Sequence, residues 1–129
     1  MTTIMVLESD VLVRTAISEH LRDCGYRVIE AVRAADVWAA AQAGTVPDVV
    51  FAGVRAGGDG GGFSLAQQLR QTHPGISVIL TSGIADAAQK SSELCEQGAV
   101  EKPYRPQDLA RRIHLLIERR RSSQQSPDE

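Results

Sequence analysis

The chain has 129 residues, a length that fits one compact domain and is short for two. Apolar residues make up 43% and charged residues 23%, the balance of a globular protein that buries a core. Basic residues (14) and acidic residues (16) nearly cancel, which argues against a dedicated nucleic-acid binder, and the basic run 119–121 complements a helix dipole. No apolar run approaches the roughly 20 residues of a membrane span, and no secretory signal precedes residue 4, so we expect a cytoplasmic protein.

The cysteines and histidines give no sign of a reactive or metal-binding cluster. Cys24 and Cys95 both fall in helix-like stretches, and we expect two reduced thiols rather than a disulfide framework. His20 and His114 lie in helical stretches and His73 lies in a turn, none of them at metal-ligand spacing. A zinc site would need more cysteine and histidine than the pattern offers.

Short apolar runs alternate with helical patterns along the whole chain. Strands are predicted over 4–7, 26–29, 48–52 and 76–80, with a very short fifth over 99–101. Helices are predicted over 13–24, 34–43, 63–72, 86–97 and 106–121. This alternation predicts an α/β domain over 1–121, with a doubly wound five-stranded parallel sheet covered by helices on both faces. The polar tail 122–129 is expected to fray.

Right-handed crossovers would place a functional site at the carboxyl ends of these strands. The polar or otherwise unusual residues expected there are Glu8, Ser9, Asp10, Gly53, Ser82 and Lys102. Glu8 and Asp10 offer carboxylates for a hard cation, although Asp10 also fits the N-cap of the following helix. The Ser82 hydroxyl fits either an anion donor or a turn residue, and Lys102 fits either a charge over the strand ends or a solvated side chain.

The glycine cluster 57–62 is expected to form a loop and invites a nucleotide-binding interpretation. The dinucleotide fingerprint fails because Phe63 occupies the third glycine position. The P-loop pattern fails as well, because Phe63 stands where a lysine is required. A small nucleotide-binding α/β protein is therefore kept only as a minor alternative.

Five segments together carry a family resemblance: 4–8 with Asp10, 21–28, 47–51, 78–83 and 102–106. In their order and spacing they resemble the receiver domain of bacterial two-component response regulators. The resemblance runs from about Ile4 to Arg121, nearly the whole chain. It implies the five-stranded, flavodoxin-like receiver fold.

The resemblance also implies a phosphorylation pocket. Members of the family take a phosphoryl group from a histidine kinase onto an aspartate at the end of strand three. Two acidic residues after strand one bind magnesium. A serine or threonine after strand four and a lysine after strand five contact the phosphoryl group.

Carried onto this chain, that pattern is incomplete. Glu8 matches the first acidic position, but Ser9 falls on the second. Gly53 falls on the phosphoacceptor position, whereas Ser82 and Lys102 match the hydroxyl and lysine positions. Many members place a switching aromatic three residues before the lysine, where this chain has alanine.

A pocket of this kind is expected to be degenerate. Glu8 and Lys102 sum to zero charge, so Mg²⁺ should bind weakly or not at all, and Lys102 is predicted to pair with Glu8. Asp48 lies at the opposite end of strand three, roughly 16 Å from the site, and cannot replace the missing acceptor. Asp59 in the glycine loop is nearer and is the possible surrogate acceptor.

The expected function is that of a stand-alone atypical receiver, because the chain ends 27 residues past Lys102. It would not be an enzyme and would act by contact with a histidine kinase, another receiver or an effector protein, with a homodimer left open. The residues expected on its contact surface are Lys90, Glu93, Arg105, Gln107 and Arg111. The alternatives are a receiver phosphorylated on Asp59 and the nucleotide-binding protein described above.

Overall fold

The computed structural model of the chain describes residues 2–55, 61–97 and 106–124. These residues form four strands, β1 (Thr3–Leu7), β2 (Arg27–Ala31), β3 (Val49–Gly53) and β4 (Ser77–Thr81). They also form five helices, α1 (Val11–Asp23), α2 (Ala34–Gln42), α3 (Gly61–Thr72), α4 (Ile84–Glu96) and α5 (Pro106–Gln124). The predicted strand over 99–101 lies outside the described residues.

The four strands form one parallel sheet in the order β2-β1-β3-β4. Met5 of β1 lies opposite Ile29 on one side and Val50 on the other, and Gly53 at the end of β3 lies opposite Thr81. The order reverses direction between β1 and β3, as in a doubly wound fold. Such a reversal opens a crevice outside the carboxyl ends of the strands, where the sequence places its polar residues.

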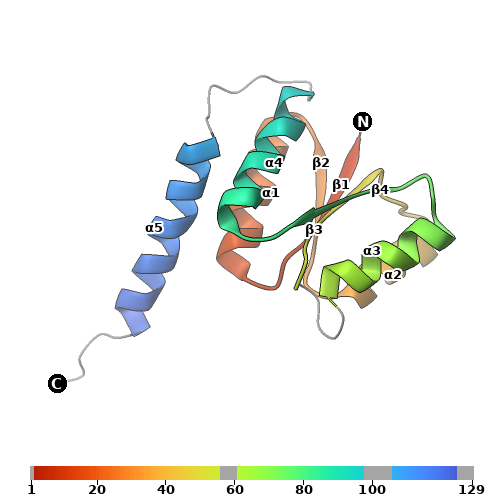
Figure 1. Cartoon of the computed structure of the whole chain (residues 1–129), viewed down its shortest axis with the longest axis horizontal. Coiled ribbons are helices and arrows are strands. Elements are labelled where there is room, and N and C mark those ends of the chain that lie inside the picture. Colours follow the sequence, from red (N-terminus) through yellow and green to blue (C-terminus); the bar gives the residue numbers. More distant parts are fainter. Residues whose placement is uncertain (1, 56–60, 98–105, 125–129) are drawn as a thin grey trace.

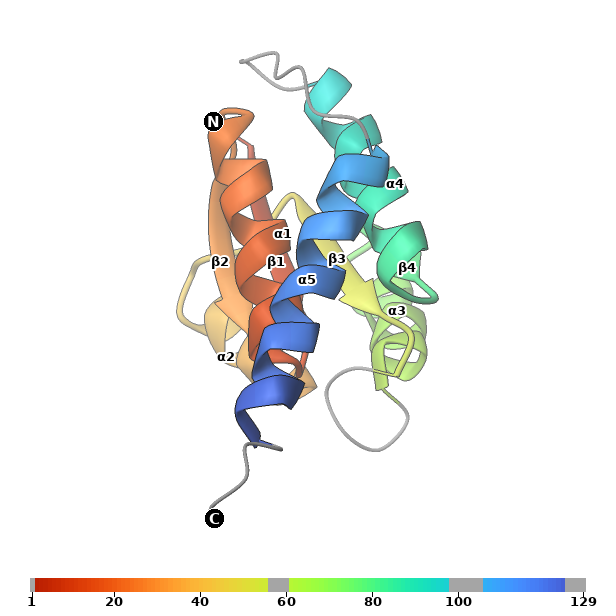
Figure 2. The same ribbon diagram turned by 90° about the vertical axis from the view of Figure 1, so that its left-hand side faces the viewer.

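Helices cover both faces of the sheet, as predicted. Helices α1, α4 and α5 lie on one face, and α2 and α3 lie on the other (Figure 1). Turned by 90°, the molecule shows α5 in front of the sheet beside α1 and α4 (Figure 2). Strand β1 contributes to the core on both faces of the sheet, because successive side chains of a strand point to opposite faces. Ile4 and Val6 lie in the core under α1, α4 and α5. Met5 and Leu7 lie in the core under α2 and α3.

Helix α1 has the apolar stripe that the sequence predicts. All of its members are buried: Val13, Ala16, Ile17, Leu21 and, just past the helix, Cys24. The next residue, Gly25, has a φ of 96°, the left-handed conformation that commonly ends a helix. No helix among the described residues is long and apolar enough to cross a bilayer.

Several helix boundaries differ from the prediction, and three of the differences have a clear bearing on the structure. Helix α3 begins at Gly61, inside the glycine cluster expected to be loop, because two glycines allow its first turn to approach β3 closely. Helix α4 begins at Ile84 rather than residue 86, because the Asp86 carboxylate accepts the Ser82 backbone N–H and satisfies the start of the helix. Helix α5 continues to Gln124, beyond residue 121 and into the stretch expected to fray.

Candidate functional site

A cavity of about 470 Å³ opens at the carboxyl ends of β1, β3 and β4. Four of the residues expected at this edge line it: Glu8, Ser9, Gly53 and Ser82. Arg55, after β3, lines it as well. Asp10 is not in the lining, and Asp59 and Lys102 lie outside the described residues, as does the predicted pairing of Lys102 with Glu8.

The Glu8 carboxylate takes part in the turn that leads into α1. Its Oε2 accepts the backbone N–H of Asp10 at 2.8 Å. The Glu8 carbonyl accepts a hydrogen bond from the Arg14 guanidinium at 2.9 Å. One of the two Glu8 carboxylate oxygens is therefore engaged by the loop itself, and the side chain is half-buried.

Asp10 is the N-cap of α1, the structural alternative that the sequence left open. Its Oδ1 accepts the backbone N–H groups of Leu12 at 2.9 Å and Val13 at 3.4 Å. The Arg120 guanidinium of α5 binds both carboxylate oxygens, at 3.0 and 3.3 Å. Partial burial acts to raise the pKa of Asp10, but the hydrogen bonds from Arg120 and the helix backbone outweigh it and hold the pKa below its usual value. Both oxygens are thus hydrogen-bonded within the protein, and the structural N-cap role of Asp10 is confirmed.

The end of β3 presents backbone alone. Gly53 is half-buried and has no functional group beyond its amide. The first turn of α3 packs directly on it, since a Cβ added at Gly62 would lie 2.2 Å from the Gly53 carbonyl oxygen. Gly61, with a φ of 55°, also leaves no room for a Cβ, which would lie 2.6 Å from the Val54 carbonyl oxygen. These two glycines of the cluster therefore serve helix packing.

The end of β4 carries a polar network that the sequence reasoning missed. Ser82 donates its backbone N–H to Asp86 Oδ2 at 2.9 Å and its hydroxyl to the same oxygen at 3.4 Å. Lys90 donates to the Leu80 carbonyl at 2.5 Å and pairs with Asp86 at 3.2 Å. The spacing of four from Ser82 to Asp86 and from Asp86 to Lys90 could have indicated this network in advance.

This network fixes the charge of Asp86. The backbone N–H of Ser82 is the main cause that lowers the pKa of Asp86 below its usual value, and Lys90 adds to it. Asp86 is therefore ionised near neutral pH and holds the Ser82 hydroxyl. Among the described lining residues of the cavity, Glu8 supplies one negative charge and Arg55 one positive charge, so the two cancel.

A second groove of about 510 Å³ lies between α4 and α5. Its lining comprises Ala85, Gln89, Pro106, Gln107, Ala110, Arg111 and His114. Two residues of the expected contact surface, Gln107 and Arg111, lie here. The Lys90 ammonium is instead bound to the end of β4, and Arg105 lies outside the described residues.

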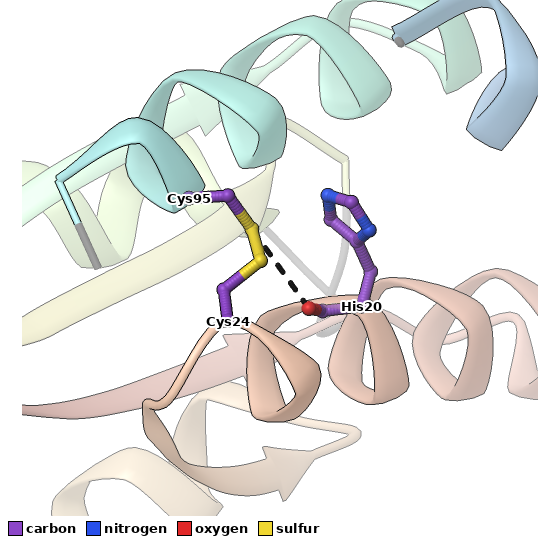
Figure 3. Close-up of side chains that lie close together, drawn as sticks. All are labelled: His20, Cys24 and Cys95. Atoms are coloured by element: carbon purple, nitrogen blue, oxygen red, sulfur yellow. Dashed lines mark hydrogen bonds between the residues drawn. A yellow bond between two sulfur atoms is a disulfide. The ribbon is translucent and has the colours of Figure 1, made fainter. Parts of the chain in front are cut away.

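The prediction of two reduced thiols is wrong. Cys24 and Cys95 form a disulfide with a Cα–Cα distance of 5.3 Å that joins the end of α1 to the last turn of α4 (Figure 3). The expectation that no histidine clusters with the cysteines is wrong too, because His20 lies beside both sulfurs. Burial is the main cause that lowers the pKa of His20, so its imidazole is neutral near pH 7. Sequence could not reveal this cluster, because Cys95 is 71 residues from Cys24 and the packing of two helices brings them together.

Comparison with known proteins identifies the family. The chain matches the family described as "Response regulator receiver domain" over residues 4–114. It therefore belongs to the response regulator receiver domain family, as its sequence segments suggested.

Solved structures agree with this assignment. A receiver domain protein from Clostridium thermocellum shares 21% identity, with 94% of this chain and 98% of that one covered and a TM-score of 0.59. A response regulator from Thermotoga maritima shares 24% identity over 92% of this chain and 98% of that one, with a TM-score of 0.56. NtrX from Brucella abortus shares 26% identity over 92% of this chain but only 26% of its own length, with a TM-score of 0.59. The likeness to the first two shows the fold, and the third has much chain beyond the matching region.

Proposed function

We propose that this receiver domain signals by protein contact and does not accept a phosphoryl group. The observation that carries the proposal is Gly53 at the carboxyl end of β3, in the lining of the cavity between the β1 and β4 ends. An acyl phosphate forms when a carboxylate oxygen attacks phosphorus, and glycine has no side-chain nucleophile.

The remaining groups of the cavity support the same conclusion. Ser9 stands at the family's second acidic position and cannot supply a charge. One oxygen of the Glu8 carboxylate binds the Asp10 amide, and the Ser82 hydroxyl binds Asp86. Mg²⁺ gives up its waters reluctantly and is usually held by carboxylates together with phosphate oxygens. We therefore expect magnesium to bind this cavity weakly.

The α4–α5 groove is the proposed contact surface. Gln107, Arg111 and His114 contribute polar or basic side chains to its lining, and Ala85 and Ala110 contribute apolar ones. The partner classes proposed are a histidine kinase, another receiver domain or an effector protein, in a bacterial cytoplasmic two-component system. The stand-alone character of the domain and its lack of enzymatic activity stay predictions.

Incubation with acetyl phosphate and Mg²⁺ tests the proposal. We expect the intact mass of the native protein to stay unchanged, because the nucleophile is missing. A gain of one phosphoryl group that survives mild acid would contradict the proposal. Loss of that gain in Asp59→Asn would identify Asp59 as the surrogate acceptor.

The variant Gly53→Asp supplies the matched comparison. If the missing carboxylate were the only defect, this variant would gain one phosphoryl group under the same conditions. We expect little or no gain, because Ser9 and the engaged Glu8 leave magnesium poorly held.

Thermal unfolding with and without nucleotides tests the nucleotide-binding alternative, since a ligand that binds the native state raises the melting temperature. A rise with ATP or ADP would favour the nucleotide-binding alternative instead.

A further inference from the structure

Three buried side chains meet where the ends of α1 and α4 pack together. Cys24 is 0% exposed, His20 5% and Cys95 7%. One potential ligand atom from each lies within 4.8 Å of the other two. Figure 3 shows the imidazole and the two sulfurs gathered in the space between the helices. Neither the cavity at the sheet edge nor the α4–α5 groove includes any of the three.

The local sequence explains half of this arrangement. His20 and Cys24 are four residues apart, one helical turn, so both lie on the same side of the end of α1. Gly25 then turns the chain away, which leaves Cys24 as the cap of the helix. The side chains of this turn therefore face the neighbouring helix together.

A second set of contacts holds Cys95 opposite them. The hydroxyl of Tyr26 donates to the carbonyl of Leu94 at 2.5 Å, which ties the residue before Cys95 to the start of β2. Ile17 of α1 and Ala87 and Ala88 of α4 belong to the same cluster of buried apolar residues, so the two helices also pack through apolar side chains. These contacts do not involve the S–S bond, so they can keep the three side chains close when that bond is open.

The chemistry of the three groups is that of a metal site. Imidazole nitrogen and two cysteine thiolates are a common ligand set for Zn²⁺, leaving a fourth position for water or a ligand from outside. In the disulfide neither sulfur is a thiolate, so the oxidised protein lacks two of the three ligands. The Cys95 Sγ lies 3.8 Å from the His20 carbonyl oxygen, a contact that only a reduced thiol can turn into an S–H···O hydrogen bond.

We propose that His20, Cys24 and Cys95 form a redox-gated site for a thiophilic divalent cation such as Zn²⁺. A dithiol reductant transfers two electrons and two protons to the Cys24–Cys95 bond, which breaks to give two thiols, while the reductant becomes a disulfide. Binding of the cation then releases the two thiol protons and forms two metal–thiolate bonds and one metal–imidazole bond. Reoxidation by a disulfide oxidant reverses the sequence and expels the metal.

The distances are compatible with this change. Zinc–sulfur bonds of about 2.3 Å in a tetrahedral site set the two sulfurs about 3.8 Å apart. All three ligand atoms already lie within 4.8 Å of one another, so after the S–S bond opens the two sulfurs need only move apart to this spacing. Rotation about the Cα–Cβ bonds moves a sulfur on this scale.

Titration of the reduced chain with Co²⁺, a spectroscopic substitute for Zn²⁺, tests the proposal. The protein is reduced with a phosphine, freed of reductant without oxygen, and titrated in parallel with the oxidised protein. We expect one equivalent to bind the reduced form only, with a thiolate-to-cobalt charge-transfer band and the visible bands of tetrahedral cobalt. One equivalent of Zn²⁺ should then remove both sets of bands.

Variants separate this site from a purely structural disulfide. His20→Gln keeps both cysteines and can still form the disulfide, so its oxidised form remains a folded reference. We expect its affinity for Co²⁺ in the reduced state to fall about tenfold or more, as for loss of an important metal-site interaction. His114→Gln, an exposed histidine on α5, is the matched control and should bind as the native protein does.

Two results would overturn the proposal. One is the absence of thiolate–cobalt bands when the reduced native protein meets stoichiometric metal. The other is a reduced His20→Gln that binds as tightly as the native protein, since loose thiols alone would then account for the binding. Circular dichroism of each reduced sample shows whether its helices persist during the titration.

Discussion

The Asp86 carboxylate links the end of β4 to the first turns of α4. It accepts the backbone N–H and the hydroxyl of Ser82, and it pairs with Lys90 one helical turn further along α4. Lys90 in turn binds the last part of β4 through the Leu80 carbonyl. The Ser82 hydroxyl, which the sequence resemblance predicts at the family's phosphoryl-contacting position, is therefore held by α4.

The lowered pKa of Asp86 predicts an acid-dependent part of the stability. Because the pKa in the folded state lies below the usual 3.8, the unfolded chain binds the proton first as pH falls. The stabilisation is fully present above about pH 4 and is lost as pH falls through the folded-state pKa. Asp86→Asn keeps an acceptor for Ser82 but does not titrate, so its urea-unfolding free energy should fall less steeply below pH 4. Parallel acid profiles for the variant and the native protein would contradict this.

Asp10 illustrates what residue patterns can and cannot predict. An aspartate directly before an apolar helical stripe indicates an N-cap, and the structure confirms it. The bidentate pairing with Arg120 could not be predicted, because its partner is 110 residues away. The basic residues at the end of α5 complement the helix dipole, and Arg120 also ties α5 to the β1–α1 turn.

At the scale of elements, α3 is placed by two glycines. The sequence shows a glycine cluster, which indicates conformational freedom and predicts a loop. The structure uses Gly61 and Gly62 for close approach, so that the first turn of α3 rests against the end of β3. Sequence alone cannot distinguish these two uses, because both require only the absence of a Cβ.

Gly62→Ala tests whether this close approach holds α3 in place. Alanine favours a helix by about 1 kcal/mol over glycine, but overpacking costs about 1–3 kcal/mol. The added Cβ would lie 2.2 Å from the Gly53 carbonyl oxygen and 3.2 Å from the Cβ of Ala52, so overpacking against backbone should prevail. With the overpacking cost at the upper end of its range, we expect a net destabilisation of about 2 kcal/mol, measured as a lower urea midpoint.

Gly75→Ala is the matched control for that substitution. Nothing lies within 4 Å of a Cβ built at Gly75, and its φ is not among the positive values. Its stability should stay within about 0.5 kcal/mol of the native protein. A Gly62→Ala variant as stable as this control would show that α3 can shift away from β3 at little cost.

The local pattern of apolar residues predicts the strands and helices well, because the side of each element that is buried must be apolar. Strands β1, β3 and β4 begin or end within one residue of the predicted runs, since each is a short apolar segment between polar ends. The α1 stripe is buried in full because a helix on a sheet must turn one side inward. Helix starts are less predictable, because they depend on which side chain caps the first turn.

At the scale of the whole molecule, the disulfide between Cys24 and Cys95 could not be predicted from the sequence. Cys24 belongs to the α1 stripe, so its burial follows from periodicity. Its partner depends on the packing of α4 against α1 on one face of the sheet, which brings Cys95 beside Cys24. Two cysteines that are 71 residues apart carry no local signal of that neighbourhood.

The Cys24–Cys95 bond should contribute a large part of the stability of the oxidised protein. It closes a loop of 71 residues, and the chain-entropy argument then gives about 4 kcal/mol, at the upper end of typical values. Against a total of about 5–15 kcal/mol for an ordinary domain, its reduction should lower the urea midpoint markedly. Measuring unfolding with and without reductant, both in the presence of EDTA, checks this without interference from metal.

The double variant Cys24→Ala/Cys95→Ala is the control, because its unfolding should not respond to reductant at all. If the urea midpoint of the native protein does not change with reductant either, the disulfide adds nothing to stability. With EDTA replaced by Zn²⁺, the reduced native protein should regain part of the loss, since a ligand that prefers the native state stabilises it by mass action. The double variant lacks both sulfur ligands and should gain nothing from zinc, so the two proteins together separate the covalent bond from the metal.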